Sequence, residues 1–236
     1  MELVLNNIKK SFGDKIVLQD INLEVEDGEF VCILGHSGCG KSTMLNLIAG
    51  FTKPDSGDIS VNRVPIGKPN QERGIVFQEH ALFPWYTVFE NIAFGPTVQG
   101  KSKEEVQKIA YKYLQMIGLE PFEHHYPSEL SGGMKQRVGI ARALAGQPKL
   151  LLMDEPFAAL DVFTKETMRK ELIDIWNELK TTIIFITHDI AEAVYLADRI
   201  VVMKQGVIAA EKQISMKRPR KIENSLVQEL QQILIN

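Results

Sequence analysis

The feature that most restricts the fold of this chain is a glycine-rich run, GHSGCGKS at Gly35–Ser42, between two apolar segments. Val31–Leu34 before it is a short run of strand-forming residues, and Ser42–Ala49 after it has helical spacing and ends at Gly50. A strand, a glycine turn and a helix form the setting in which GxxxxGK[ST] binds phosphate. Glycines let successive N–H groups point inward, and the helix dipole adds positive potential. The sequence therefore predicts an α/β fold with a phosphate-binding loop.

A second apolar run, Leu150–Met153, ends in the acidic residues Asp154 and Glu155. Such a run is typical of a central parallel strand, and open α/β sheets bind ligands at the carboxyl ends of their strands. We predict that Asp154 holds Mg²⁺ through water and that Glu155 polarises the water that attacks a γ-phosphate. Lys41 would reach the β- and γ-phosphates, and the Ser42 hydroxyl would bind Mg²⁺. Alone, the acidic pair also fits an ordinary loop opening.

A third run, LSGGMKQR at Leu130–Arg137, opens a segment with helical spacing. Ser131, Gly132 and Gly133 at a helix N-terminus would offer a hydroxyl and N–H groups to an anion. Alone, this pattern also fits a helix cap whose glycines allow close packing. Together with the two earlier runs, LSGGMKQR followed by VGIARALAG resembles the signature motif and helix of ATP-binding cassette (ABC) ATPases. The resemblance extends over nearly the whole chain.

The resemblance implies one ABC ATPase domain over residues 1–236. Its fold would be that of a P-loop NTPase, with a RecA-like parallel core, an N-terminal antiparallel β layer and an inserted helical subdomain. The core and β layer would span residues 1–83 and 147–206, the helical subdomain residues 84–146, and a short tail residues 207–236. In this family the signature helix of one copy meets the γ-phosphate held by another copy. Two ATP molecules would therefore be shared in a head-to-tail dimer.

The resemblance also implies roles for single residues outside the three runs. Phe12 lies 23 residues before Gly35, where the family stacks an aromatic ring on adenine. Gln78 would ligate Mg²⁺ and sense a membrane partner, and Asp161 would lie in a loop that crosses the dimer interface. His188, which ends the run TTIIFIT, would contact the γ-phosphate. Alone, these residues also fit a strand-end aromatic, a solvated loop residue, a helix cap and a surface histidine.

These assignments give three sets of expected site residues. The catalytic set is Glu155 and His188, and the metal set is Ser42, Gln78 and Asp154. The nucleotide-binding set is Phe12, Gly35, His36, Ser37, Gly38, Cys39, Gly40, Lys41, Ser42, Thr43, Gln78, Ser131, Gly132, Gly133, Gln136 and Asp161. The expected cofactors are ATP and Mg²⁺.

Two longer segments, Val76–Gly95 and Phe185–Met203, resemble importer ATPases, and Met134 in the signature points to the nitrate/sulfonate/taurine branch. The resemblance implies an ATP-hydrolysing subunit on the cytoplasmic face of the membrane. Its partners would be permease subunits, a second copy and, indirectly, an extracytoplasmic solute-binding protein. The solute stays open between a nitrate-, sulfonate- or taurine-like compound and a pyrimidine precursor. The ring-rich segment Ala81–Tyr86 fits either internal packing or a groove for a membrane-subunit helix.

Two other functions fit the same motifs. One is a soluble ABC ATPase that serves assembly or repair, and the other is a scaffold that binds ATP without hydrolysing it. A net charge of −3 argues against a general nucleic-acid binder. The two cysteines, Cys32 and Cys39, indicate no disulfide framework. No segment has the length and apolarity of a membrane span, and the first residues lack the order of a signal peptide.

Local patterns predict several further elements. Leu3–Ile8 and Ile16–Val25 are expected as strands of the β layer. Residues 29–78 and 150–206 are expected to supply the parallel strands and crossover helices of the core. A helix is expected at Ser102–Gly118, with Ser102 as its cap. A basic cluster of Lys217, Arg218, Arg220 and Lys221 is interpreted as a solvated linker, with contact to acidic lipids as the alternative. A short amphipathic helix should close the chain at Ser225–Leu234.

Overall fold

The computed structural model describes residues 2–79, 81–218, 220 and 224–235. The chain divides into two compact units, one formed by Met1–Asn70 with Lys180–Asn236 and the other by Gln71–Leu179. The fold class, an α/β chain with a parallel core and an antiparallel β layer, is confirmed. The boundaries of core, helical subdomain and tail stay a prediction. No helix in the described part of the chain is both long and apolar enough to cross a bilayer.

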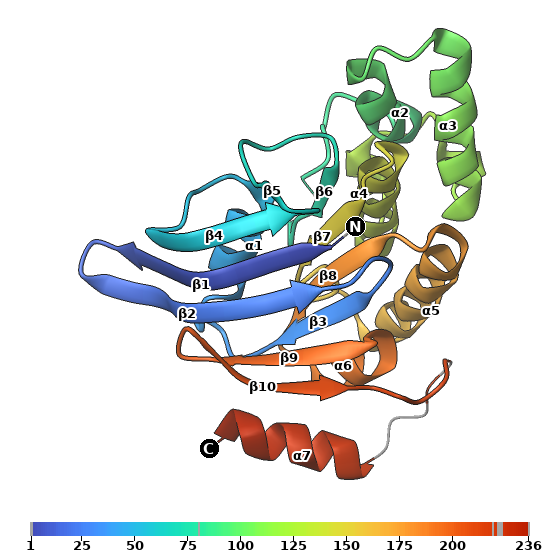
Figure 1. The fold of residues 1–236 in the computed structure, drawn as a ribbon. Coiled ribbons are helices and arrows are strands. Elements are labelled where there is room, and N and C mark those ends of the chain that lie inside the picture. Colours follow the sequence, from blue (N-terminus) through green and yellow to red (C-terminus); the bar gives the residue numbers. More distant parts are fainter. Residues whose placement is uncertain (1, 80, 219, 221–223, 236) are drawn as a thin grey trace. The chain divides into compact units, whose positions relative to one another are not determined.

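An antiparallel sheet in the first unit forms the predicted N-terminal β layer (Figure 1). Its strand order is β2-β1-β4-β5, made by β1 (Leu3–Phe12), β2 (Lys15–Val25), β4 (Ser56–Val61) and β5 (Val64–Pro65). The strand β1 runs further than expected and ends at Phe12. The strand β4 pairs antiparallel with β1, so the expectation that residues 29–78 supply only the core is wrong here. Its sequence SGDISV has no continuous apolar run, which agrees with a half-exposed layer.

The first unit also holds strands in the order β10-β9-β3-β8. The strand β3 (Phe30–Leu34) pairs in parallel with β8 (Thr182–Thr187) and β9 (Arg199–Lys204). All five residues of β3 are buried, as expected for a strand covered on both faces. The strand β10 (Val207–Gln213) pairs antiparallel with β9, so the segment expected to be a tail begins as a strand of this sheet. The helix α1 (Lys41–Ala49) follows β3 and ends at Gly50, as predicted.

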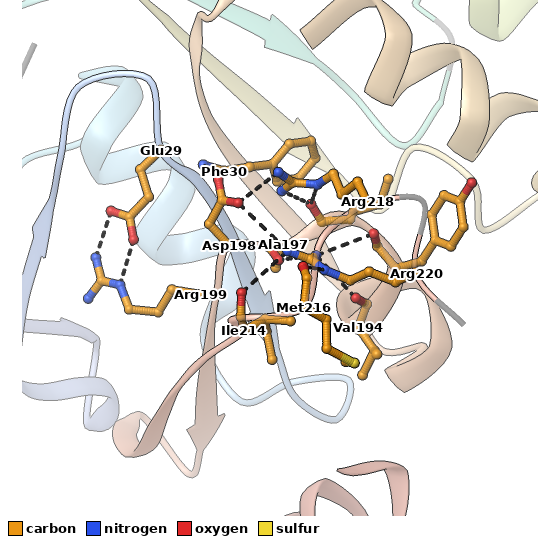
Figure 2. A network of polar contacts seen from close by, with 12 residues as sticks. Glu29, Phe30, Val194, Ala197, Asp198, Arg199, Ile214, Met216, Arg218 and Arg220 are labelled. Atoms are coloured by element: carbon orange, nitrogen blue, oxygen red, sulfur yellow. Dashed lines mark hydrogen bonds and ion pairs between the residues drawn. The ribbon is translucent and has the colours of Figure 1, made fainter. Parts of the chain in front are cut away.

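The predicted solvated linker is wrong for Arg218 and Arg220 of the basic cluster, because both side chains take part in a network of polar contacts (Figure 2). Both side chains reach the C-terminal end of the short helix α6 (Ile190–Leu196), where the last carbonyl groups have no partner within the helix. The Arg220 guanidinium donates hydrogen bonds to the carbonyl groups of Val194, Ala197, Ile214 and Met216. Burial, with the nearby Arg218 charge, lowers the pKa of Arg220 to about 10.

Arg218 completes this network. Its guanidinium donates to the carbonyl of Leu196, pairs with the Asp198 carboxylate at 2.7 Å and lies 5.8 Å from the centre of the Phe30 ring (Figure 2). The helix α7 (Asn224–Ile235) follows and packs on α6 and β9, which confirms the predicted closing helix. Lys221 lies outside the described residues. Arg218 and Arg220 therefore secure the C-terminal end of α6 within the first unit.

The second unit contains two parallel strands, β6 (Arg73–Val76) and β7 (Leu150–Asp154). Its helices are α2 (Val88–Val98), α3 (Lys103–Met116), α4 (Gly132–Ala145) and α5 (Val162–Leu179), with the 3-10 turns η1 (Glu120–Phe122) and η2 (Pro127–Glu129). The helices α2, α3 and α4 pack on one another (Figure 1). As predicted, Ser102 caps α3 and Glu105 completes the capping box. The helix ends at Met116, two residues before the expected Gly118.

Candidate functional site

The phosphate-binding loop of the first unit lies close against two neighbouring strands. A Cβ atom added to Gly40, which has a φ of 105°, would lie 2.7 Å from a Leu18 side-chain carbon and 2.9 Å from the Val17 carbonyl oxygen. A Cβ atom on Gly35 would lie 2.5 Å from the Met203 carbonyl oxygen. Only glycine fits at either position, since the obstacles include backbone atoms. The loop therefore keeps the shape in which its N–H groups can surround an anion.

Lys41 lies over this loop and is only 4% exposed. Its Nζ atom donates hydrogen bonds to the carbonyl oxygens of Gly35 at 2.8 Å and His36 at 3.1 Å. The ammonium group is therefore held against the backbone of the loop. The other loop residues differ in exposure: Cys39 is buried, Thr43 is half-buried, and the exposed residues are His36, Ser37, Gly38 and Ser42.

Gly206 supports the loop by a backbone hydrogen bond, a role that no sequence pattern indicates. Its N–H group donates to the Cys39 carbonyl at 3.1 Å, and its carbonyl accepts from the Gln19 N–H at 2.8 Å. A Cβ atom here would lie 2.5 Å from the Val17 carbonyl oxygen. In the sequence Gly206 is an ordinary turn residue between two strand-like runs, so only the folded chain shows which loop it supports.

His188 lies at the same sheet edge as the phosphate-binding loop. The strands β3 and β8 run parallel with Leu34 opposite Thr187, so Gly35 and His188 are the next residues of each strand. The turn at His188 is held by the Thr187 hydroxyl, which donates to the Glu192 carboxylate at 2.7 Å and accepts from the Asp189 N–H at 3.0 Å. Sequence reasoning missed this buried pair because a Thr and a helical Glu have no distinctive spacing.

The Phe12 ring ends β1 and is 55% exposed, so much of its surface is available for stacking. The Lys10 ammonium lies 5.4 Å from the ring centre and pairs with Asp55 at 2.7 Å. This ion pair fixes the edge of the sheet that presents the ring.

The acidic residues of the second unit lie at one edge of its two parallel strands. Asp154 ends β7, and Glu155 turns the chain sharply with a φ of 43°. Val76 of β6 pairs with Met153 of β7, so Gln78 and Glu155 each follow two residues later at the same edge. The structure thus brings together Gln78, Asp154 and Glu155. Their oxygen atoms are suitable ligands for Mg²⁺, directly or through water.

The signature run forms the N-terminus of α4. Ser131 is the cap, and its Oγ accepts a hydrogen bond from the Met134 N–H at 3.3 Å. A Cβ atom on Gly133 would lie 2.7 Å from the Thr164 methyl carbon, so the start of α5 lies directly beside the signature. Hydrogen bonds from the Thr164 hydroxyl and N–H hold the pKa of Asp161 below its usual value. The signature and the Asp161 loop are therefore neighbours in this unit.

One expected site residue does not fit. The Gln136 side chain is fully buried in α4, at 0% exposure. A nucleotide held by another copy therefore cannot touch it, and its assignment to the nucleotide-binding set is corrected. Helical periodicity directs this side chain into the interior of the unit.

A glycine loop of this shape between a buried strand and a helix defines a P-loop nucleotide-binding protein. The family model described as "ABC transporter" matches residues 18–158. The chain belongs to the ABC transporter family and is an ATPase of this class.

Its relatives agree with this family. The nitrate import ATP-binding protein NrtD of Synechocystis sp. is 48% identical over 93% of this chain and 84% of its own length. The taurine import ATP-binding protein TauB of Yersinia pestis is 48% identical over 86% of this chain and 80% of its own length. Among solved structures, cbiO1 of Clostridium perfringens has a TM-score of 0.83 and 32% identity, and the two superimpose over 89% of this chain and 88% of the other. A dimeric ATP-binding cassette bound to ADP and Pi has a TM-score of 0.79 and 36% identity, over 91% of this chain and all of the other.

Proposed function

We propose that this chain is the ATP-hydrolysing subunit of an ABC importer and works as a head-to-tail pair beneath membrane permease subunits, on the cytoplasmic face. The observation that carries the proposal is the presence, in one chain, of a glycine cradle and an exposed signature cap. The names of the nitrate and taurine import relatives favour import of a small solute of that kind, delivered by an extracytoplasmic binding protein. A pyrimidine precursor is the other solute class that the sequence allows.

Each ATP would be bound by parts of two copies. In one copy, Phe12 stacks on adenine, the loop N–H groups and Lys41 hold the phosphates, and Ser42, Gln78 and Asp154 hold Mg²⁺. Bound Mg²⁺ would neutralise negative charge on the phosphates. In the other copy, Ser131 and the first turn of α4 meet the γ-phosphate, beside the Asp161 loop. Charge-assisted hydrogen bonds across this interface would close the pair.

Hydrolysis would open the pair again. The Glu155 carboxylate accepts a proton from the attacking water, and His188 donates a hydrogen bond to the γ-phosphate. The turn at His188 is already fixed by Thr187 and Glu192, so little ordering is needed when ATP arrives. Loss of the γ-phosphate removes the group to which both copies bind, so the two copies separate.

An ATP-dependent crosslink tests the shared site. Ser131→Cys and Ser37→Cys in one chain, with Cys39→Ser to remove the loop thiol, should give a disulfide-linked dimer only when Mg-ATP is present. Ser37 is exposed, whereas Gly38 has a φ of 81° that cysteine would strain. Dimer bands on a non-reducing gel give the readout, with each single cysteine as control. Equal crosslinking without nucleotide would contradict ATP-driven closure.

A groove in the second unit is the proposed site for the permease. Its volume is about 620 Å³, and its wall includes Phe77, Phe83, Phe94 and Val98. The side chains of Phe77, Phe94 and Val98 are exposed to solvent, and Val98 is 70% exposed. Within Ala81–Tyr86, Phe83 packs 4.6 Å from the Phe94 ring while Trp85 is 66% exposed, which is compatible with internal packing and with a partner surface. An apolar helix end would cover this surface.

Val98→Glu should abolish copurification with the permease, because a carboxylate would be buried against an apolar partner. At 70% exposure the substitution leaves the fold of the free subunit intact. We expect at least about a tenfold loss of membrane protein bound, equivalent to about 1.4 kcal/mol. Ile235→Glu, at a 78% exposed position outside the groove, is the matched control. If Val98→Glu recovered as much permease as the wild-type chain, the groove would not be the permease site. A subunit that never copurifies with a membrane protein would favour the alternative of a soluble ABC ATPase.

A further inference from the structure

Arg142 joins the signature helix to the segment that follows Gln78. It lies in the last turn of α4, and its Nη1 atom donates a 2.7 Å hydrogen bond to the Ala81 carbonyl. Its guanidinium carbon also lies 5.3 Å from the centre of the Phe83 ring. Burial lowers the pKa of Arg142 from its usual value, so the side chain is substantially desolvated. A planar guanidinium can make both contacts at once, which a lysine cannot.

The segment after Ala81 is also held from α2, by a buried amide. Asn91, at 0% exposure, accepts a hydrogen bond from the Phe83 N–H at 2.9 Å and donates to the carbonyls of Tyr86 at 3.0 Å and Thr87 at 2.9 Å. These bonds fix residues 83–87 on the N-terminal turn of α2. The Ala81 end has a strained φ of 46°, and its carbonyl accepts a hydrogen bond from Arg142 of α4. The position of this end therefore depends on α4.

The helix α4 can transmit a displacement from one end to the other. Ser131 and Arg142 are 11 positions apart, or about 16 Å along a helix that rises 1.5 Å per residue. The helix has no proline, and its C-terminal end contacts α2 through the Gln99 side chain, which donates to the Gly146 carbonyl at 2.8 Å. A Cβ atom on Gly95 would lie 3.4 Å from the Gly146 Cα, so the two helices are in close contact.

We propose that Arg142 is a positioning residue that couples capping of ATP at the N-terminus of α4 to movement of the aromatic segment Ala81–Tyr86 at the groove. This inference rests on the proposed function, because it takes the signature as the cap of the partner's ATP. When the cap engages, α4 shifts, and Arg142 displaces the Ala81 backbone and the Phe83 ring with it. The groove surface then changes shape before any permease is bound.

Tryptophan fluorescence tests this coupling in the subunit alone. The chain has two tryptophans. Trp85 lies 5.7 Å from the Phe83 ring and is 66% exposed, whereas Trp176 is 7% exposed in α5. In a Glu155→Gln, Trp176→Phe background, saturating Mg-ATP should shift the Trp85 emission. Arg142→Met, which fills similar space without the hydrogen bond, should reduce that shift to less than about half, with ATP affinity within about twofold of the background.

Two further variants make the result decisive. Arg142→Lys can still donate one hydrogen bond but cannot stack as a plane, so it should retain an intermediate shift. If circular dichroism shows that Arg142→Met does not fold, the Arg142→Lys variant alone tests the coupling. Lys108→Met removes an exposed charge from α3 and should leave the shift unchanged. A full shift in both Arg142 variants, or a loss in Lys108→Met as well, would overturn the proposal. A background protein that binds no ATP would instead overturn the proposed function.

Discussion

Replacing Glu155 by glutamine should leave ATP binding nearly unchanged while the rate of ATP hydrolysis falls by about 10²–10³-fold, or about 3–4 kcal/mol in transition-state free energy. Glu155 lies in the turn directly after β7, at the same strand edge as Gln78. Glutamine has nearly the same shape but cannot accept a proton from water. Phosphate release at saturating Mg-ATP, together with calorimetric titration of ATP, separates the effect on turnover from the effect on binding.

The matched control for this substitution is Glu104→Gln, which changes an exposed carboxylate in the first turn of α3. Its turnover should equal that of the unmodified chain. If Glu155→Gln kept turnover within about threefold of wild type, a different group would be the base. If neither protein released phosphate, the non-hydrolysing scaffold would become the better interpretation.

The second large effect is expected at the lysine of the phosphate-binding loop. Lys41→Met should weaken ATP binding by about 10²–10⁴-fold, because each hydrogen bond from a charged donor contributes about 1.5–3 kcal/mol and Lys41 would make at least two. Methionine fills the same buried space, since Lys41 is 4% exposed, so the fold should remain. The hydrogen bonds to the Gly35 and His36 carbonyls are lost as well, which would loosen the loop.

Titration calorimetry with Mg-ATP measures this loss directly. Lys53→Met is a suitable control, because it removes an exposed lysine shortly after the same helix and should leave the affinity unchanged. Wild-type affinity in Lys41→Met would show that the phosphates bind elsewhere, and the assignment of the loop would be wrong.

The parts of the fold that could be predicted from the sequence are those determined by residues close together in the chain. The phosphate-binding loop needs only a strand, its glycines and α1, and the cap of α3 needs only Ser102 and Glu105, so both are visible locally. The place of β4 was missed, because its partner β1 lies some fifty residues earlier and strand pairing leaves little trace in a single sequence.

The same distinction applies to the candidate site. Motif residues such as Lys41, Glu155 and Ser131 are recognisable because their chemistry requires fixed spacing. Their supports are not, because Gly206 reaches Cys39 through the three-dimensional arrangement alone, and Thr187 and Glu192, although near in the chain, have no distinctive spacing. The assignment of Gln136 to the nucleotide-binding set was wrong for a related reason. Which face of α4 is buried depends on what the helix packs against, and the Gln136 side chain lies on the buried face.

The arginines that satisfy the end of α6 also impose an order on how this protein can be assembled during translation. Arg220 follows Val194 by 26 residues, so the ribosome makes the helix well before the side chain that completes it. His188, the proposed γ-phosphate contact, lies two residues before that helix. A nascent chain therefore has every recognisable motif in place while the helix beside this residue still lacks its final support.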